Sequence, residues 1–249
     1  MFFSHPAWNI SFHFATQSRS EVYVDRLPLE WIKSFPIYLP TKELLSIYPN
    51  FISIYDGHYL EFDETWRDTC IQLGSPLQRE PRESAISTLL EPIEAAIGGK
   101  LVLENGKFYL RSDDGKMEMG LVAEGYRKLG MLARLIATGA LHSNGFLFWD
   151  EPDANLNPKL IRVIANCIVN LSKAGLQVFI ATHSLFLIRE IELQSTSSEL
   201  HEITTNYFSF CRTANQYEIS LGTELTDLIP IVSLDEKLAQ SDRILSTAY

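Results

Sequence analysis

The chain has 249 residues, 46% hydrophobic and 21% charged, a composition typical of a globular domain and not of disordered, collagen-like or coiled-coil proteins. Acidic residues number 31 against 21 basic ones, and the net charge of −10 argues against nonspecific binding to DNA or to anionic membranes. The three cysteines lie far apart, which fits neither a disulfide framework nor a Cys-x-x-Cys metal site and indicates a reducing compartment.

No stretch of the sequence has the character of a membrane span or of a secretory signal. The most apolar stretch, residues 135–149, is interrupted by Thr138 and by a polar His-Ser-Asn triplet. The N-terminus has neither a basic region nor a small-residue cleavage site. We therefore expect a cytoplasmic protein that does not interact with membranes.

Residues 1–40 are predicted to form an N-terminal β region. Apolar and polar residues alternate from Trp8 to Thr16, and a polar turn leads into Glu21–Val24, which predicts a half-buried hairpin. A short apolar run, Pro36–Leu39, predicts a strand that delivers the polar residues 41–43 to a surface.

Residues 55–118 are predicted to form an inserted lobe of helices and a hairpin. One helix is expected to open at Asp63, and another at Pro81, with apolar residues at helical spacing up to Gly98-Gly99. In the run Lys100–Arg111, the Asn105-Gly106 pair between alternating segments is the strongest short signal for a β-hairpin.

From residue 119 to 195 the pattern becomes that of an α/β core. Helices are predicted over 124–139, over 158–173 and from Ser184 onward, and they alternate with apolar strands at 146–149 and 178–181. Continuously apolar strands indicate a mostly parallel sheet that helices cover on both faces. Residues 200–249 are predicted to add two strands, 207–211 and 217–221, and a short helix after Leu234.

Two of these buried strands end in polar residues. Asp150 and Glu151 follow the first strand, and Thr182-His183-Ser184 follows the second. The carboxyl ends of parallel strands form the edge at which open α/β sheets bind ligands. A carboxylate in line with its strand suits Mg²⁺, the next one can deprotonate a water, and a helix N-terminus beside the histidine attracts anions. Each pattern taken alone is as typical of solvated acids or of a polar helix cap.

Their order and spacing are more specific. A helix start at Gly125, then the strand that ends in Asp-Glu-Pro, then the strand that ends in Thr-His-Ser resemble the second half of an ABC-type ATPase core. The likeness is strongest to the bacterial AAA-family ATP-binding proteins related to chromosome-maintenance and recombination-repair ATPases. It implies a P-loop NTPase fold, one ATPase-like domain over residues 1–249 with its nucleotide-site core at 119–195, and ATP and Mg²⁺ as cofactors.

The resemblance also assigns roles to single residues. Asp150 resembles the Walker B metal ligand, Glu151 the catalytic base and His183 the switch histidine that contacts the γ-phosphate. A degenerate signature motif around Gly125 is implied to reach the nucleotide of an opposite subunit. Two further nucleotide-binding segments are implied. The D-loop, residues 153–158, contributes Asn155 and Asn157. The Q-loop contains no Gln, so Lys42 or Glu43 would have to serve there.

One element of the family is absent, because the sequence contains no G-x-x-x-x-G-K-[ST] motif. The resemblance therefore implies an ATP phosphohydrolase core without its N-terminal P-loop segment, weak or inactive alone, in a nucleotide-sandwich homodimer or with a partner ATPase subunit that supplies the P-loop. The alternative is a non-hydrolysing degenerate module that binds or regulates a partner protein. Nucleic-acid binding is implied by family analogy only, because Arg127, Lys128 and Arg134 read better as a solvated helix face than as a basic strip.

Overall fold

The computed structural model describes residues 10–13, 21–29, 36–58, 60–78, 84–141, 145–196, 203–212 and 217–247. The chain divides into two compact units, Met1–Phe35 and Pro36–Tyr249. Among the described residues no helix is both long enough and apolar enough to cross a membrane. The domain boundaries expected from the sequence stay predictions.

The first unit contains an antiparallel strand pair, β1 (Ser11–His13) and β2 (Tyr23–Arg26). The ring nitrogen Nδ1 of His13 lies 2.9 Å from a carboxylate oxygen of Asp25 across the pair. The predicted pairing of the two strands is confirmed where the structure describes them, and the rest of the predicted hairpin lies outside the described residues. The predicted half-burial is wrong, because every residue of both strands is exposed.

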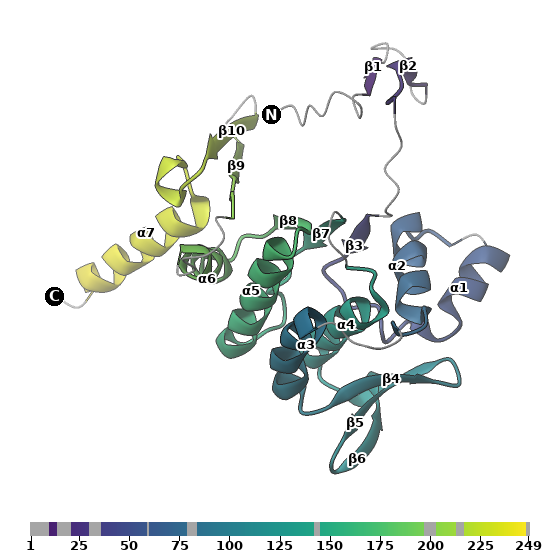
Figure 1. The fold of residues 1–249 in the computed structure, drawn as a ribbon. Helices are drawn as coiled ribbons and strands as arrows, with labels where there is room; N and C mark the ends of the chain where they lie inside the picture. Colours follow the sequence, from purple (N-terminus) through teal and green to yellow (C-terminus); the bar gives the residue numbers. More distant parts are fainter. Residues whose placement is uncertain are drawn as a thin grey trace. The chain divides into compact units, whose positions relative to one another are not determined.

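A parallel three-stranded sheet organises the second unit. Its strands are β3 (Ile37–Leu39), β7 (Phe146–Asp150) and β8 (Gln177–Ala181), in the spatial order β3-β7-β8 (Figure 1). All three are parallel and in register, so that they end at one edge. The predicted parallel sheet is confirmed, and the strand predicted at 36–39 is its first member.

The helices that flank these strands begin and end close to the predicted residues. They are α4 (Glu124–Thr138), α5 (Pro158–Lys173) and α6 (Leu185–Thr196). Gly139 ends α4 with a left-handed φ of +79°, the usual glycine C-cap. The remaining helices of the first half are α1 (Tyr48–Gly57), α2 (Glu64–Gly74, capped by Asp63 as predicted) and α3 (Ser84–Ile97), of which α1 had no sequence signal that we recognised.

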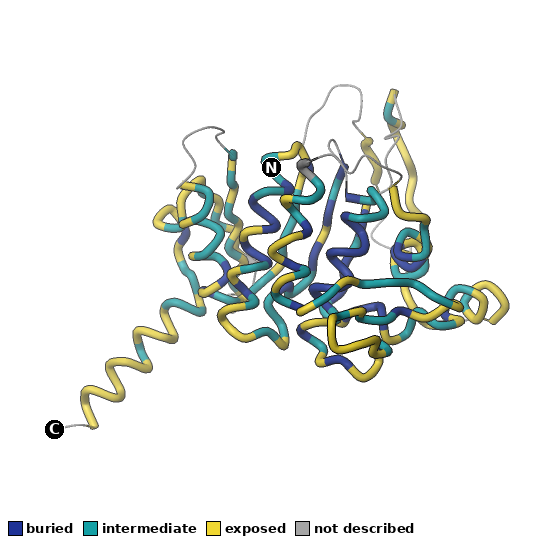
Figure 2. The backbone as a smooth tube through the Cα atoms, turned by 60° about the horizontal axis from the view of Figure 1, so that its bottom comes forward, coloured by how far each residue is buried: buried dark blue, intermediate teal, exposed yellow. Residues whose placement is uncertain are grey.

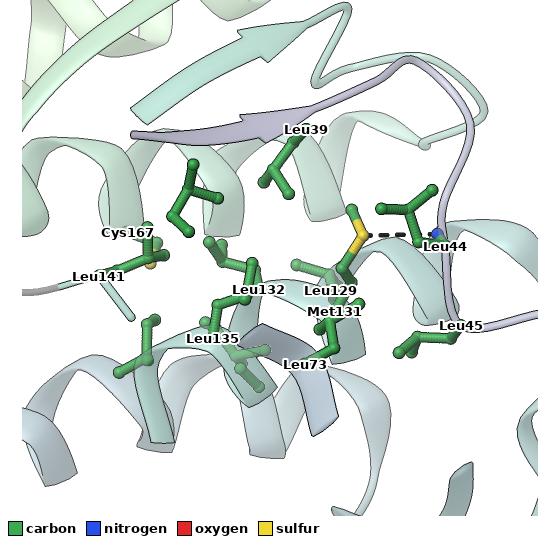
Figure 3. Close-up of a cluster of buried hydrophobic side chains, with 14 of the residues drawn as sticks. Leu39, Leu44, Leu45, Leu73, Leu129, Met131, Leu132, Leu135, Leu141 and Cys167 are labelled. Atoms are coloured by element: carbon green, nitrogen blue, oxygen red, sulfur yellow. Dashed lines mark hydrogen bonds between the residues drawn. The ribbon is translucent and has the colours of Figure 1, made fainter. Parts of the chain in front are cut away.

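One face of the sheet forms the core of the unit. Leu39, Leu147 and Trp149 are at most 1% exposed and belong to the same buried cluster as Leu129 and Leu132 of α4. Figure 3 shows Leu39 pointing from β3 toward the α4 side chains. This is the covered face of the sheet, and helices α2, α3 and α5 contribute side chains to the same cluster.

The opposite face carries aromatic side chains, and we call it the open face. It consists of Tyr38, Phe148 and Phe179, which are aligned across the three strands. Phe148 is 39% exposed, and its ring stacks on that of Phe179 with centroids 4.6 Å apart. Burial on both faces, which the continuously apolar strands predicted, is therefore wrong for the described residues, because the helices that contact the sheet lie on the covered face.

The remaining strands form two antiparallel groups. The predicted hairpin around Asn105-Gly106 is confirmed as β4 (Lys100–Glu104) and β5 (Lys107–Ser112), and an unpredicted β6 (Gly115–Glu118) extends it to three strands. Both predicted C-terminal strands are present as β9 (Tyr207–Arg212) and β10 (Tyr217–Gly222). The last helix, α7 (Val232–Thr247), is longer than predicted, and Figure 2 shows it almost wholly exposed. Single 3₁₀ turns occur at Met119–Leu121 and Leu225–Asp227.

Candidate functional site

The polar residues that follow β3, β7 and β8 gather at one edge of the sheet, which we call the site edge. Asp150 is paired with Ala181 across β7 and β8, and the backbone N–H of Glu151 donates to the carbonyl of Ala181 at 2.8 Å. One step further on, Nδ1 of His183 lies 2.7 Å from Oε1 of Glu151. The structure thus brings together the three residues that the sequence singled out.

The two partners of this contact differ in exposure. The side chain of His183 is 86% exposed, whereas that of Glu151 is 22% exposed. An imidazole nitrogen bonded to a carboxylate is held in one orientation, which leaves the other ring nitrogen for a ligand. The pair therefore presents a histidine at the surface and a half-buried carboxylate behind it.

Asp150 has a partner that the sequence analysis did not select. The hydroxyl of Thr41 donates to Oδ2 of Asp150 at 2.6 Å, from a loop 109 residues away in the chain. Thr41 follows β3, so a polar residue after a predicted strand was the available signal. The residue chosen there was Lys42, which is exposed at this position, and its role stays a prediction.

Glu43, the other residue that could have replaced the missing Gln, is fully buried in an ion pair. Its Oε1 accepts from Nε of Arg127 at 2.7 Å, and its Oε2 accepts from the backbone N–H of Ser46 at 3.1 Å. A carboxylate engaged in this way is not available to a ligand. The pair also ties the loop after β3 to the first turn of α4.

The loop that follows β7, residues 151–156, has an unusual backbone. Glu151 and Asn155 both have a left-handed φ, +47° and +62°. Asn tolerates this conformation, but for most other residues it costs roughly 1–2 kcal/mol. The loop is also tied to the end of β8, because the hydroxyl of Thr182 donates to Oδ1 of Asp153 at 2.6 Å.

A buried lysine holds the same loop. Lys128 of α4 is 0% exposed, and its ammonium donates to the carbonyls of Glu151 at 3.0 Å and of Ala154 at 2.9 Å. Burial lowers the pKa of Lys128, while the negative charge of Asp153 and of other carboxylates acts in the opposite direction. In the sequence, the signal for this buried contact was that Lys128 lies one turn before Leu132, on the apolar side of α4.

The predicted solvated face of α4 is therefore wrong. Arg127 is paired with Glu43, Lys128 is buried, and Arg134 is only 5% exposed. Arg134 donates to the backbone carbonyls of Leu73 and Ser75, each at 2.9 Å. These cations lie on the helix face that packs against the core, where backbone carbonyls and one carboxylate replace water.

Gly125 has a packing reason of its own. A Cβ on this buried glycine would lie 2.8 Å from Cδ2 of Leu156 and 3.0 Å from the carbonyl oxygen of Asn155. Glycine therefore lets the start of α4 approach the loop. Asn155 itself is exposed, and Asn157 caps α5 by accepting from the N–H of Leu160 at 3.1 Å. The nucleotide contacts predicted for Gly125, Asn155 and Asn157 stay predictions.

The oxygen atoms at the site edge suit one kind of metal ion. The described residues contain no cluster of three or more His, Cys, Asp or Glu side chains arranged to hold a metal. Asp150 with the Thr41 hydroxyl instead offers a carboxylate beside a second hard oxygen. Mg²⁺ is commonly bound by one or two carboxylates together with water and phosphate oxygens, so these residues fit Mg²⁺ and not a zinc site.

Solved structures of SMC heads are similar in fold but distant in sequence. The Smc head domain of Pyrococcus furiosus bound to the C-terminal domain of ScpA is 16% identical with a TM-score of 0.41, over 65% of this chain and 38% of that one. An SMC ATPase from work on ATP-driven dimerization and DNA-stimulated activation is 18% identical with a TM-score of 0.42, over 64% and 91%. The SMC head domain from Thermotoga maritima is 14% identical with a TM-score of 0.40, over 73% and 61%.

No curated protein sequence matches the chain. A protein-family model described as "AAA domain, putative AbiEii toxin, Type IV TA system" matches residues 32–189. That segment runs from just before β3 into α6 and includes every residue of the site edge. The chain belongs to this family of AAA domains and is an ATPase-like nucleotide-binding domain.

Proposed function

We propose that the site edge binds ATP together with Mg²⁺ and hydrolyses it when a partner supplies a phosphate-binding loop. The observation that carries this proposal is the contact between His183 and Glu151 at the ends of two adjacent parallel strands, next to Asp150. A metal-binding acid, a base and a histidine at one sheet edge can serve the transfer of a phosphoryl group to water.

Each of these residues has a specific role in the proposal. Asp150 and Thr41 offer oxygen ligands to Mg²⁺, which when bound neutralises charge on the phosphates. Glu151 accepts a proton from the attacking water. His183, whose Nδ1–H is engaged by Glu151, turns its other ring nitrogen toward a phosphate oxygen. That nitrogen donates to the phosphate when the ring is the imidazolium, because a neutral ring that gives Nδ1–H to a carboxylate has only an acceptor there.

The charge at the site edge explains why a partner is needed. Three carboxylates lie there, those of Asp150, Glu151 and Asp153, whereas the Lys128 ammonium is engaged by carbonyls. A P-loop supplies several charge-assisted hydrogen bonds of about 1.5–3 kcal/mol each. Without them a micromolar affinity falls to about millimolar or weaker, because about 1.4 kcal/mol is tenfold.

In a nucleotide-sandwich dimer, the start of α4 at Gly125 would approach the nucleotide of the other subunit. Lys42, Asn155 and Asn157 are exposed, so their side chains are accessible to a nucleotide. Gly125 is buried, so in this arrangement it would act only through the N-terminus of its helix. A homodimer and a complex with a different ATPase subunit both satisfy this arrangement.

Binding of Mg²⁺-ATP, measured by titration calorimetry with and without Mg²⁺, tests the proposal. We expect weak binding that requires Mg²⁺, is lost in Asp150→Asn and persists in Glu151→Gln. Asp113→Asn is the matched control, because Asp113 is an exposed acid between β5 and β6. Binding that is unchanged in Asp150→Asn would contradict the assigned metal site.

A second candidate function is a non-hydrolysing module that docks on a partner protein. The open face favours it, because the exposed ring of Phe148, stacked on the partly buried Phe179, offers apolar surface for an interface. The same titration bears on both functions. Weak binding that Mg²⁺ strengthens supports the ATPase, whereas no affinity for ATP at any concentration tested, with or without Mg²⁺, supports the module.

A further inference from the structure

Lys128 is a buried cation that the proposed chemistry does not use. It is fully buried, and its hydrogen bonds go to two backbone carbonyls of one loop, those of Glu151 and Ala154. Burying an ammonium group is unfavourable unless its hydrogen bonds are replaced. An apolar residue would fill the same place in α4 without that cost, so the lysine is expected to act on the loop.

The loop requires such support. It begins with Glu151 at φ +47° and turns again at Asn155 with φ +62°. A non-glycine residue stays in this region only where its surroundings hold it there. The two carbonyls that Lys128 binds belong to Glu151 itself and to the residue that precedes Asn155, so the ammonium bridges the two left-handed positions.

The contact is part of a larger junction between α4 and the loop. Gly125, one turn before Lys128, lets Leu156 and the Asn155 carbonyl approach the helix. The first turn of α4 and residues 151–156 therefore pack as one body. Within this packed unit, the group with a proposed chemical role is the Glu151 carboxylate, which lies 2.7 Å from Nδ1 of His183.

We propose that Lys128 is a positioning residue: it holds the left-handed turn after β7 and thereby fixes the Glu151 carboxylate against His183. The effect on catalysis rests on the proposed function. The effect on the geometry does not, since it concerns the chain without any ligand.

The first test compares Lys128→Met with Arg134→Met. Both variants remove a buried cation of α4 that binds two backbone carbonyls, but Arg134 binds Leu73 and Ser75, away from the site edge. The readout is the pair of ring ¹⁵N signals of His183 in the full chain with labelled histidine, assigned with His183→Gln. We expect Lys128→Met to displace these signals, Arg134→Met to leave them in place, and Lys128→Arg to restore them in part.

Two results would overturn the proposal. One is a folded Lys128→Met chain with unchanged His183 signals, because the lysine would then not act on Glu151. The other is an equal displacement in Arg134→Met, because the effect would then report general loosening of α4.

A second variant keeps the test usable if Lys128→Met does not fold. Gly125→Ala pushes on the same loop, since its Cβ would meet Leu156 and Asn155, whereas Gly120→Ala has open space around the added Cβ. We expect Gly125→Ala to displace the His183 signals and Gly120→Ala to leave them unchanged. Unchanged signals in Gly125→Ala would mean that the loop does not transmit to Glu151.

Turnover separates this inference from the proposed function. In the complex that hydrolyses ATP, we expect Lys128→Met to lower kcat roughly tenfold or more with little change in KM, because a displaced base reduces rate more than binding. If kcat/KM falls only because KM rises, with kcat unchanged, the positioning role is contradicted. His183 signals that move in a chain without any affinity for ATP would refute the proposed function and leave the positioning role intact.

Discussion

The two faces of the β3-β7-β8 sheet come from the same three strands, yet they differ sharply in burial at the central strand β7. On the covered face, Leu147 and Trp149 are 0% and 1% exposed beneath α4 and α5. On the open face, Phe148 between them in sequence is 39% exposed. Both kinds of position are apolar, so residue type does not distinguish them. A continuously apolar strand therefore shows which residues can be buried, whereas the packing of the helices determines which residues are buried.

The open face also lies next to the chemistry. Tyr38 is aligned with Phe148 in the sheet, and its pKa is raised by partial burial and then by the negative charge of Asp150. The covered face, in contrast, holds the strands in register so that their ends meet. The covered face therefore positions the site edge, and the open face lies beside it.

The largest expected effect tests the difference between the two faces directly. Leu147→Ala should lower the free energy of unfolding by about 2–5 kcal/mol, because it leaves a cavity in a packed core. Phe148→Ala should cost about 1 kcal/mol, mostly the stacking on Phe179, because the ring is already partly in water. Urea unfolding of both variants measures the difference. Equal losses would show that the open face is covered in solution.

A smaller effect appears at alkaline pH. Burial raises the pKa of the Cys70 and Cys167 thiols from 9.0 to about 12. The unfolded chain loses these protons first, so stability is complete below pH 9 and falls as the pH rises toward 12. At pH 10 each thiol should cost on the order of 1 kcal/mol.

Unfolding of Cys167→Ala as a function of pH measures this effect, since the variant should lose part of the decline above pH 9. Cys211→Ala is the control, because Cys211 lies in β9 outside the buried core. A slope that Cys167→Ala leaves unchanged would refute burial of this thiol beneath the sheet.

The smallest effect concerns α5, a helix that packs on the covered face. Asn157→Ala removes the N-cap of α5 and should cost about 1 kcal/mol. Asn166→Ala, on the exposed side of α5, removes only a side-chain bond to Asn170 and should be close to neutral. Thermal unfolding distinguishes the two variants. A neutral Asn157→Ala would show that α5 is held in place by packing alone.

Much of the fold was predictable because its signals are local. Caps at Asp63 and Asn157, the C-cap at Gly139 and the Asn-Gly turn at 105–106 each mark an element boundary within a few residues. The β7-α5-β8 order followed from hydrophobic spacing, and with it the approach of Glu151 to His183, since adjacent parallel strands end at one edge.

The contacts that were missed are those that depend on distant partners. Thr41 meets Asp150 across 109 residues, and nothing local favoured it over Lys42. Lys128 was predicted to be solvated because lysines are rarely buried. The carbonyls that it binds belong to a turn in which Glu151 and Asn155 are left-handed, and the identity of these two residues does not predict that conformation. Helix and strand patterns do not carry this information.

The cations sequestered along α4 change how the molecule looks to a polyanion. Lys128 and Arg134 count among the 21 basic residues, but their charges are enclosed by backbone carbonyls, and Arg127 is cancelled by Glu43. None of these three cations is therefore presented freely on the surface of α4. A polyanion that approached α4 would therefore meet less positive charge than the sequence of this helix suggests.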